Sequence, residues 1–234
     1  MRAKIDIGFD FRRDAKGRDP DAHSKTLRSY HRMLWSKPLP DGHVLDLDDT
    51  TPGSYLHHRS SLGDFSLASD TVVPSFEFLP HIHDYVSEAE LQAFNTIGYT
   101  IGAMMVFPGK QVDGKWTINQ ARGCTRQVRD RFDLTLECIR RHYAGGRSPL
   151  ADVLLRYGDF FALFKSFRGY VEFFLLEDLV APDFAAVHIS GLFDDFARSP
   201  IPGSAEEYSA YKNASIAFIE ARNRRIQSSL TPVA

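Results

Sequence analysis

Cysteine is scarce in this sequence, and no apolar run is long. Cys124 and Cys138 are the only two cysteines among 234 residues, and no CxxC pair occurs. We therefore expect two reduced thiols rather than a disulfide framework or a cysteine-ligated zinc ion. The most apolar stretch, residues 96–108, is well short of the ~20 residues that span a bilayer. The first residues lack the apolar segment of a signal peptide, so a cytoplasmic protein without a membrane partner is expected.

Charge of one sign is not in excess either. The formal net charge is −2, so the overall charge favours neither nucleic acid nor an anionic membrane as a partner. Hydrophobic residues make up 43% of the chain, which is enough for a large core without support from metals or disulfides. Linkers, repeats and low-complexity segments are absent. We expect one globular domain over residues 1–234, β-rich in 1–120 and helical in 125–226.

The first half of the chain shows β-type patterns. Period-two alternation or short apolar segments between turn residues occur at 4–11, 44–47 and 55–79. Asp113-Gly114 lies between the apolar runs 99–107 and 116–118. Asp-Gly favours a two-residue hairpin turn, because that turn needs positive φ angles. A central β-hairpin is therefore predicted.

Helical spacing and capping residues are more frequent in the second half. The expected helices are 27–34 after an N-cap at Ser24, a helix through Leu91 and Phe94 that opens at Ser87, 128–143, one that starts at Ser148-Pro149, 160–180, and 204–226. Strands first and helices later favour an α+β fold. We predict a mainly antiparallel amino-terminal and central sheet with a hairpin, packed against carboxy-terminal helices.

Aromatic residues are concentrated in the segment 160–180. We predict that the buried core includes Phe161, Phe164, Phe173 and Phe174, because several exposed aromatics together would form an aggregating surface. Truncation of Phe173 to alanine is expected to cost about 3–5 kcal/mol. Removal of Arg122, treated as a pocket or surface residue, is expected to cost almost nothing.

The segment 119–126 carries the clearest candidate ligand site. A strand, a glycine turn and a helix are expected there, and lysine and arginine exceed acidic residues between 110 and 147. Free N–H groups at a helix start bind anions, and arginine offers two parallel donors to phosphate or carboxylate. We predict that Arg122 and Arg126 bind an anionic ligand and that Asn119 orients it. The alternative interpretation is a solvated basic face, because Walker and GxGxxG motifs are absent.

His58 and Asp70 are the candidate catalytic residues, for acid–base chemistry. His58 would point inward because it shares a strand face with Leu56, although an edge strand with solvated polar residues is the simpler interpretation. His81 and His83 would share a strand face suited to a metal, but Pro80 precedes them and HExxH is absent. We therefore predict no metal site, and no particular cofactor is indicated.

Several separate stretches of the chain carry a resemblance to a known family. They are DFR at 10–12, WSKPLP at 35–40, YLHH at 55–58, NQARG at 119–123, DRFDLTLECIRR at 130–141 and RNRRI at 222–226. Over nearly its whole length the chain resembles a bacterial family known only as a domain of unknown function. The resemblance implies no activity, but it includes the polar segments singled out above.

Two functional hypotheses follow from these patterns. The first is a small-molecule pocket, which an enzyme would use, for an anionic or nucleotide-like ligand at 119–126. The alternative is a non-enzymatic interaction module of the phage-defence or toxin–antitoxin type that binds protein or RNA, suggested by the aromatic segment 160–180. Such a module would co-purify with a partner or form a homodimer, and RNA binding would weaken steeply with salt.

Overall fold

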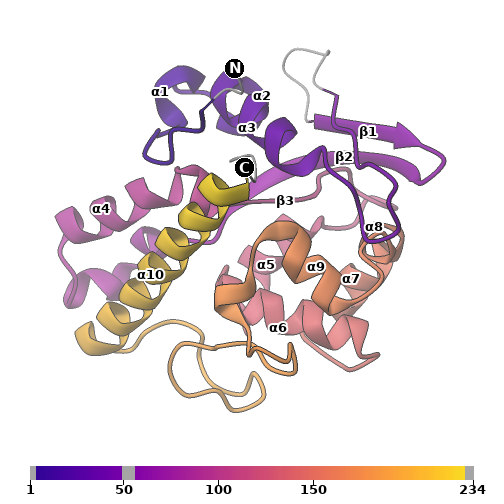
Figure 1. Ribbon diagram of the computed structural model, residues 1–234. Coiled ribbons are helices and arrows are strands. Elements are labelled where there is room, and N and C mark those ends of the chain that lie inside the picture. Colours follow the sequence, from indigo (N-terminus) through magenta and orange to yellow (C-terminus); the bar gives the residue numbers. More distant parts are fainter. Residues whose placement is uncertain (1–3, 49–55, 230–234) are drawn as a thin grey trace.

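Three antiparallel strands and a larger set of helices form an α+β fold, as predicted (Figure 1). The structure is a computed structural model that describes residues 4–48 and 56–229. The strands are β1 Leu56–Ser60, β2 Gly63–Thr71 and β3 Met104–Pro108. The helices are α1 Arg12–Ala15, α2 Pro20–His23, α3 Lys25–Trp35, α4 Glu88–Gly98, α5 Ile118–Cys124, α6 Phe132–Tyr143, α7 Ala151–Arg156, α8 Gly158–Ala162, α9 Phe167–Phe174 and α10 Ala205–Ser229. Short 3-10 helices are η1 Phe76–Phe78, η2 Pro80–Asp84, η3 Ile101–Ala103 and η4 Glu177–Leu179.

Strand β2 lies at the centre of the sheet. Its first half pairs with β1, with His58 opposite Phe65, and its second half pairs with β3, with Asp70 opposite Met105. The hairpin of the sheet is therefore β1–β2. Both faces of β3 are covered by helices, which explains why its side chains are all buried.

The predicted central hairpin is wrong. Asp113 and Gly114 do have positive φ angles of 53° and 66°, so the turn forms, but only a single bridge joins Val112 to Lys115. The chain then enters α5, because a capping box forms at its start. The Thr117 hydroxyl accepts a hydrogen bond from the Gln120 backbone N–H, and the Gln120 side-chain oxygen accepts one from the Thr117 backbone N–H. This capping box competes with strand formation and the sequence interpretation overlooked it.

Other element predictions also needed correction. Residues 4–11 form no strand, although Ile5 and Phe11 are buried as their alternation suggests. Of residues 44–47 only Val44 makes a bridge, to Pro38, and Tyr55 lies outside the described residues. The apolar segment 160–180 is not one helix, because Lys165 has a positive φ and the Ser166 side chain caps a new helix, α9.

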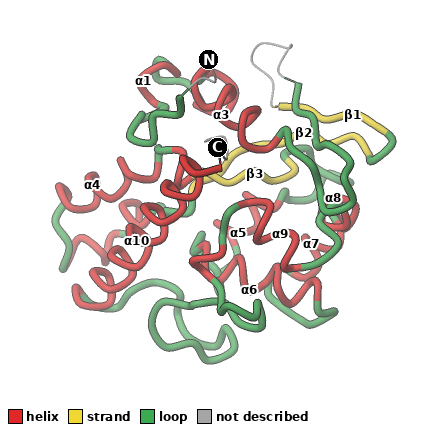
Figure 2. Tube along the Cα trace, viewed as in Figure 1, coloured by secondary structure: helices red, strands yellow, loops and turns green. Residues whose placement is uncertain are grey.

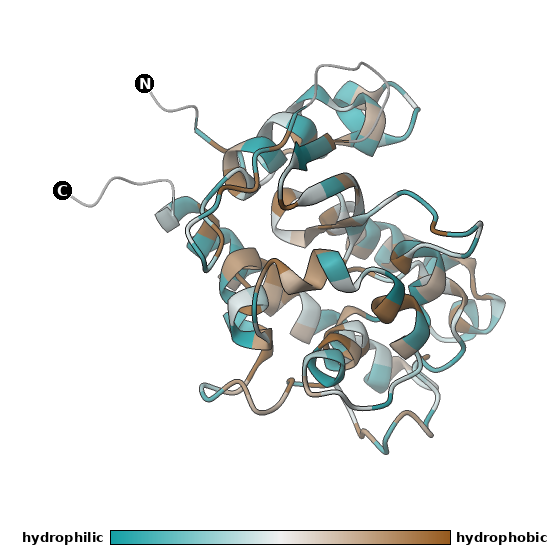
Figure 3. Cartoon of the chain, turned by 90° about the vertical axis from the view of Figure 1, so that its right-hand side faces the viewer, coloured by the Kyte–Doolittle hydropathy of each residue, from teal (hydrophilic) through white to brown (hydrophobic). Residues whose placement is uncertain are grey.

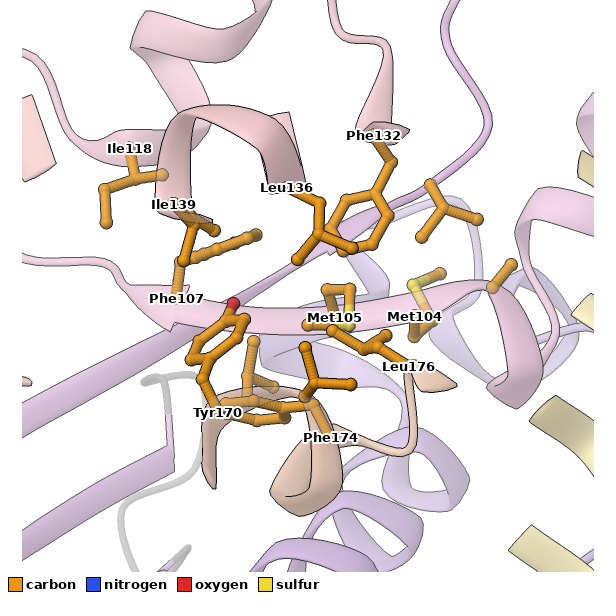
Figure 4. Close-up of a cluster of buried hydrophobic side chains, with 14 of the residues drawn as sticks. Met104, Met105, Phe107, Ile118, Phe132, Leu136, Ile139, Tyr170, Phe174 and Leu176 are labelled. Carbon is orange, nitrogen blue, oxygen red and sulfur yellow. The ribbon is translucent and has the colours of Figure 1, made fainter. Parts of the chain in front are cut away.

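The core surrounds β3. Figure 4 shows side chains of α5 and α6 on one side of this strand and side chains from residues 170–176 on the other. The residues labelled there are Ile118 on α5, Phe132, Leu136 and Ile139 on α6, Tyr170 and Phe174 on α9, and Leu176 just after α9. The prediction that Phe161, Phe164, Phe173 and Phe174 are buried is confirmed.

Helix starts follow their capping residues closely. Ser24 caps α3 and Ser87 caps α4, as predicted. Before α10, the Ser204 hydroxyl accepts a hydrogen bond from the Glu207 backbone, as predicted. Ser148 makes no such bond to α7, which begins at Ala151 after Leu150. Along most helices, hydrophilic and hydrophobic residues alternate (Figure 3), as expected of helices with one face in the core.

A long irregular segment, residues 181–203, joins η4 to α10 (Figure 2). Loops of this length without helices or strands are uncommon inside a folded domain and often have a functional role. In the described part of the chain, no helix is both long and apolar enough to cross a membrane.

Candidate functional site

His58 points into the protein from β1, as predicted, and both ring nitrogens have protein partners. Only 2% of the residue is exposed, and the ring stacks on Phe65. Nδ1 lies 2.7 Å from the Asp46 carbonyl oxygen and Nε2 lies 2.8 Å from the Ser60 hydroxyl. Nδ1 therefore carries the proton, and Nε2 accepts from Ser60. In this arrangement the ring has a structural role in the strand, and its role in catalysis stays a prediction.

Asp70, Asn119 and Arg122 come together, but His58 does not join them. Arg122 Nη1 donates to Asp70 Oδ2 at 2.5 Å, and Asn119 Nδ2 donates to the Ser69 carbonyl oxygen at 3.1 Å. His58 pairs with Phe65, five positions from Asp70 along β2, so roughly 16 Å of strand separates them. The four candidate residues therefore do not form one site.

Arg122 is fully buried and holds several elements together. Beyond Asp70, its guanidinium and Nε donate to the Thr135 hydroxyl at 3.0 Å and to the backbone oxygens of Asp130 at 3.0 Å and Thr71 at 3.3 Å. Burial raises the pKa of Asp70 to about 7, although the Arg122 charge acts in the opposite direction. Arg122 thus ties α5 to β2 and to the turn before α6.

A second buried polar network lies beside Asp70 and includes residues that the sequence interpretation missed. Trp35 Nε1 donates to His31 Nδ1 at 2.9 Å, so the His31 proton is on Nε2 and is donated to Ser69 at 2.8 Å. Ser69 in turn donates to Asp21 at 2.7 Å. Burial lowers the pKa of His31 to about 3 and raises that of Asp21 to about 6.

This network contains serine, histidine and aspartate, but it is not a nucleophilic triad. A triad needs a histidine that accepts the serine proton, whereas the His31 ring donates to Ser69 here. The only local sequence cue was the spacing of His31 and Trp35, which places both on one face of a helix. Ser69 and Asp21 lie too far along the chain for any spacing rule to connect them.

Arg126 lies in a different place, at the edge of a solvent-exposed hollow of about 490 Å³. Two segments form this hollow, 126–129 and 196–201. Arg129 and Arg198 line it with Arg126, and the side chains of these three arginines make no hydrogen bond or ion pair with the described residues. Its other lining residues are Gln127, Phe196, Ala197, Ser199, Pro200 and Ile201. We refer to this feature as the arginine hollow.

Backbone geometry fixes the first wall of the arginine hollow. Val128 is fully buried, and Arg129 and Asp130 both have positive φ, at 43° and 67°. Such conformations are costly for residues other than glycine and persist only when surrounding bonds enforce them. Here the Asp130 backbone N–H donates to the Arg122 carbonyl oxygen at 3.0 Å, and Arg122 Nη2 donates back to the Asp130 carbonyl oxygen.

Two further arginines anchor the second wall. Arg131 pairs with Asp133 at 2.5 Å and donates to the backbone oxygens of Ser190 and Pro200. Arg141 pairs with Asp195 at 2.6 Å, and its guanidinium lies over the neighbouring Phe196 ring. The segment that presents Arg198 is thereby held against α6.

A separate cavity of about 420 Å³ lies between α6, α10 and the start of the long irregular segment. Its lining is mostly apolar and includes Phe132 and Phe218. The two carboxylates that face it, Asp133 and Asp178, both accept hydrogen bonds from neighbouring arginines. No unpaired carboxylate therefore lines this cavity among the described residues.

No metal site emerges from the part of the chain that is described. No group of three or more histidine, cysteine or acidic side chains lies close enough to hold an ion there. His81 and His83 lie on η2 rather than on a strand, and His83 Nε2 lies 2.9 Å from the Glu77 carbonyl oxygen.

Of the residues in the arginine hollow, the sequence interpretation selected only Arg126. The sequence could also have suggested Arg129, because it continues the helical spacing of Arg122 and Arg126 in the basic stretch. Arg198 had no local signal, since it is distant in sequence and only the fold brings it to the hollow. The strand–glycine–helix element expected at 119–126 does not form, because α5 already begins at Ile118.

Comparison with known proteins identifies the family. Neither the curated proteins nor the solved structures include a significant match. A family model does match, and it covers residues 5–226 of the chain, including the whole arginine hollow. That near full-length match confirms the resemblance drawn from the sequence. The chain belongs to DUF6994, a family of unknown function.

Proposed function

We propose that this protein binds a small anionic ligand, such as a phosphate ester or a nucleotide, in the arginine hollow. The observation that carries the proposal is the convergence of three unpaired arginines, Arg126, Arg129 and Arg198, from two distant segments. Guanidinium groups bind phosphate or carboxylate through two parallel hydrogen bonds. Three of them around one hollow suit a ligand with more than one negative charge.

Nearby acidic residues do not cancel this positive charge. The hollow has no acidic lining residue among the described residues. Asp130 lies beside Arg129 in sequence but faces Arg122, with 3.5 Å between Asp130 Oδ1 and Arg122 Nη2. Asp195 is engaged by Arg141. The carboxylates closest in sequence are therefore committed to the arginines that build the walls.

The walls also offer contacts to an uncharged part of the ligand. Phe196 and Pro200 are mostly buried, and Ile201 is half-buried beside them. Ligand sites commonly combine such apolar surface with a few polar groups that fix orientation. An organic phosphate would use both parts of the hollow, whereas a free inorganic anion would use only the arginines.

The proposal is for binding and assigns no reaction. Among the described residues, no histidine, cysteine or carboxylate lines the hollow. The catalytic roles of His58 and Asp70 remain predictions, and neither residue is part of the hollow. The interaction-module hypothesis loses its original support, because the aromatic residues that suggested it are buried.

Titration calorimetry with ATP and with pyrophosphate at low salt tests the proposal. We expect wild type to bind at least one probe, and Arg126→Gln/Arg198→Gln to weaken binding at least about tenfold, or about 1.4 kcal/mol. Arg147→Gln is the matched control, because Arg147 is exposed and lies outside the hollow. Absence of binding, or equal weakening by Arg147→Gln, would contradict the proposal. Salt-sensitive RNA binding without small-anion binding would favour the alternative module.

A further inference from the structure

A third hollow, of about 390 Å³, lies between the chain after α3 and the start of α9. It shares no lining residue with the arginine hollow. Lys37 lines its inner side, and Lys165, Ser166, Arg168 and Glu172 lie around it. We call it the Lys37 pocket.

The Lys37 ammonium lies against two aromatic rings. Nζ is 5.3 Å from the centre of the Trp35 ring and 4.7 Å from the centre of the Phe173 ring. It makes no hydrogen bond or ion pair with any residue that the structure describes. Aromatic surface therefore covers part of the amine, which loses some of the hydration that favours the ammonium ion.

The charged groups packed against Lys37 come from two other elements. Arg222 of α10 is fully buried, and its guanidinium lies over Trp35 at 5.5 Å. Glu177 of η4 is the acid whose charge acts on Lys37. Burial and the charge of Arg222 lower the pKa of Lys37 to about 8, against the opposing effect of Glu177. An exposed lysine has a pKa of about 10.4, so far more of Lys37 is the neutral amine near pH 7.

The outer part of the Lys37 pocket carries two cations, each paired with a carboxylate. Lys165 lies 3.2 Å from Asp41 and Arg168 lies 2.7 Å from Glu172. Both ion pairs are largely exposed, and pairs of that kind contribute little and exchange partners readily. The carboxylate or phosphate of a molecule that enters the pocket would compete with Asp41 or Glu172 for one of these exposed cations.

We propose that Lys37 is a nucleophilic amine that forms a Schiff base with a small carbonyl compound bearing an anionic group. Desolvation in an apolar pocket and a neighbouring cation are the two features that activate lysine amines for this chemistry. The neutral amine adds to the carbonyl carbon to give a carbinolamine. The carbinolamine loses one water molecule as the carbon–nitrogen double bond forms, and the imine nitrogen takes a proton from solvent.

Reductive trapping tests this inference on the wild-type protein. The probe is glyoxylate, a small aldehyde with a carboxylate, in the presence of cyanoborohydride at pH 7, followed by peptide mapping. We expect Lys37 to be modified at least about tenfold faster than Lys115, because a larger share of Lys37 is unprotonated. Lys115 is the internal control, since it is exposed and does not line the pocket.

Three further measurements sharpen the result. The advantage of Lys37 over Lys115 should shrink above pH 10, where both amines lose their protons. Propanal, which lacks a charge, should label Lys37 more slowly than glyoxylate does. In Lys37→Arg, labelling at the other lysines should stay unchanged, which shows that the fold is intact. Lys37 labelled no faster than Lys115 at pH 7 would overturn the inference, whatever the arginine hollow binds.

Discussion

The arginines that stabilise the core and two of the three that line the hollow, Arg126 and Arg129, come from the same stretch of sequence but differ in their partners. Arg122 is fully buried and faces Asp70, whereas Arg126, four residues later, is exposed and has no partner among the described residues. Arg131 and Arg141 resemble Arg122, because each pairs with a carboxylate and fastens a wall of the hollow. Paired arginines thus build the scaffold, and unpaired ones remain free for a ligand.

Arg122→Ala should have the largest effect on stability. The change leaves the Asp70 carboxylate without its main partner in a buried setting, and breaking such a pair costs about 3–5 kcal/mol. This corrects the sequence-based expectation of almost no cost. Urea denaturation beside Phe173→Ala, expected to lose a similar amount, is the measurement.

A double variant separates charge from packing at this position. Arg122→Met/Asp70→Asn removes both charges and should recover part of the loss seen in Arg122→Ala. A urea midpoint for Arg122→Ala close to that of wild type would show that the ion pair is not needed for folding. The contrast between Arg122 as a scaffold residue and Arg126 as a ligand-binding residue would then disappear.

Asp21 offers a test of a buried carboxyl whose carboxylate accepts hydrogen bonds from the Ser69 backbone and hydroxyl. Its folded-state pKa, about 6, lies above the ordinary value of 3.8. Below about pH 3 both folded and unfolded states hold the proton, and between pH 4 and 6 the unfolded state has released it while the folded state still holds it. Wild type should therefore lose about 2 kcal/mol relative to Asp21→Asn as the pH rises from 4 to 7.

The test depends on how the difference in unfolding free energy between wild type and Asp21→Asn changes with pH, not on its value at one pH. Chemical denaturation of both proteins at several pH values provides it, and other titrating groups cancel in the comparison. A difference that stays flat would mean that Asp21 ionises as an ordinary exposed carboxyl does.

Thr117→Ala should have an intermediate effect, because it removes the capping box at the start of α5. Loss of a threonine N-cap costs typically about 1 kcal/mol. Helix α5 carries Arg122 and leads directly to Arg126, so the change should also weaken anion binding slightly. Thermal unfolding measures the effect on stability. The control is Thr125→Ala at the other end of α5, where the cap bond comes from the backbone and not from the side chain. Equal loss of stability in both variants would argue against a role for the Thr117 capping box.

Arg126→Gln should have the smallest effect on stability, within about 0.5 kcal/mol, as for other exposed residues. Its effect should be on anion affinity instead, which makes it the inverse of Arg122→Ala. Unfolding measures the stability and calorimetry measures the anion affinity of the same preparations, which tests this contrast between the two variants. A marked loss of stability in Arg126→Gln would show that Arg126 belongs to the scaffold.

Local features of the fold could be predicted well from sequence. Ser24 and Ser87 marked true helix starts, and Asp113-Gly114 marked a true turn. These features depend on backbone hydrogen bonds and φ preferences within a few residues, so nearby residues suffice to define them. The hairpin around the turn failed, because the following segment had a better local alternative in the helix capped by Thr117.

The candidate site could be predicted only in part. The sequence alone determined that a basic stretch exists near Arg126 and that the aromatic residues around Phe173 are buried, since composition and hydrophobicity decide both. Only the tertiary structure decided which arginines keep their charge available. Asp70 lies on β2 and Arg198 in a distant loop, and the fold places the first against Arg122 and the second beside Arg126. The physical reason is that an ion pair depends on distance in space, which spacing along the chain does not determine.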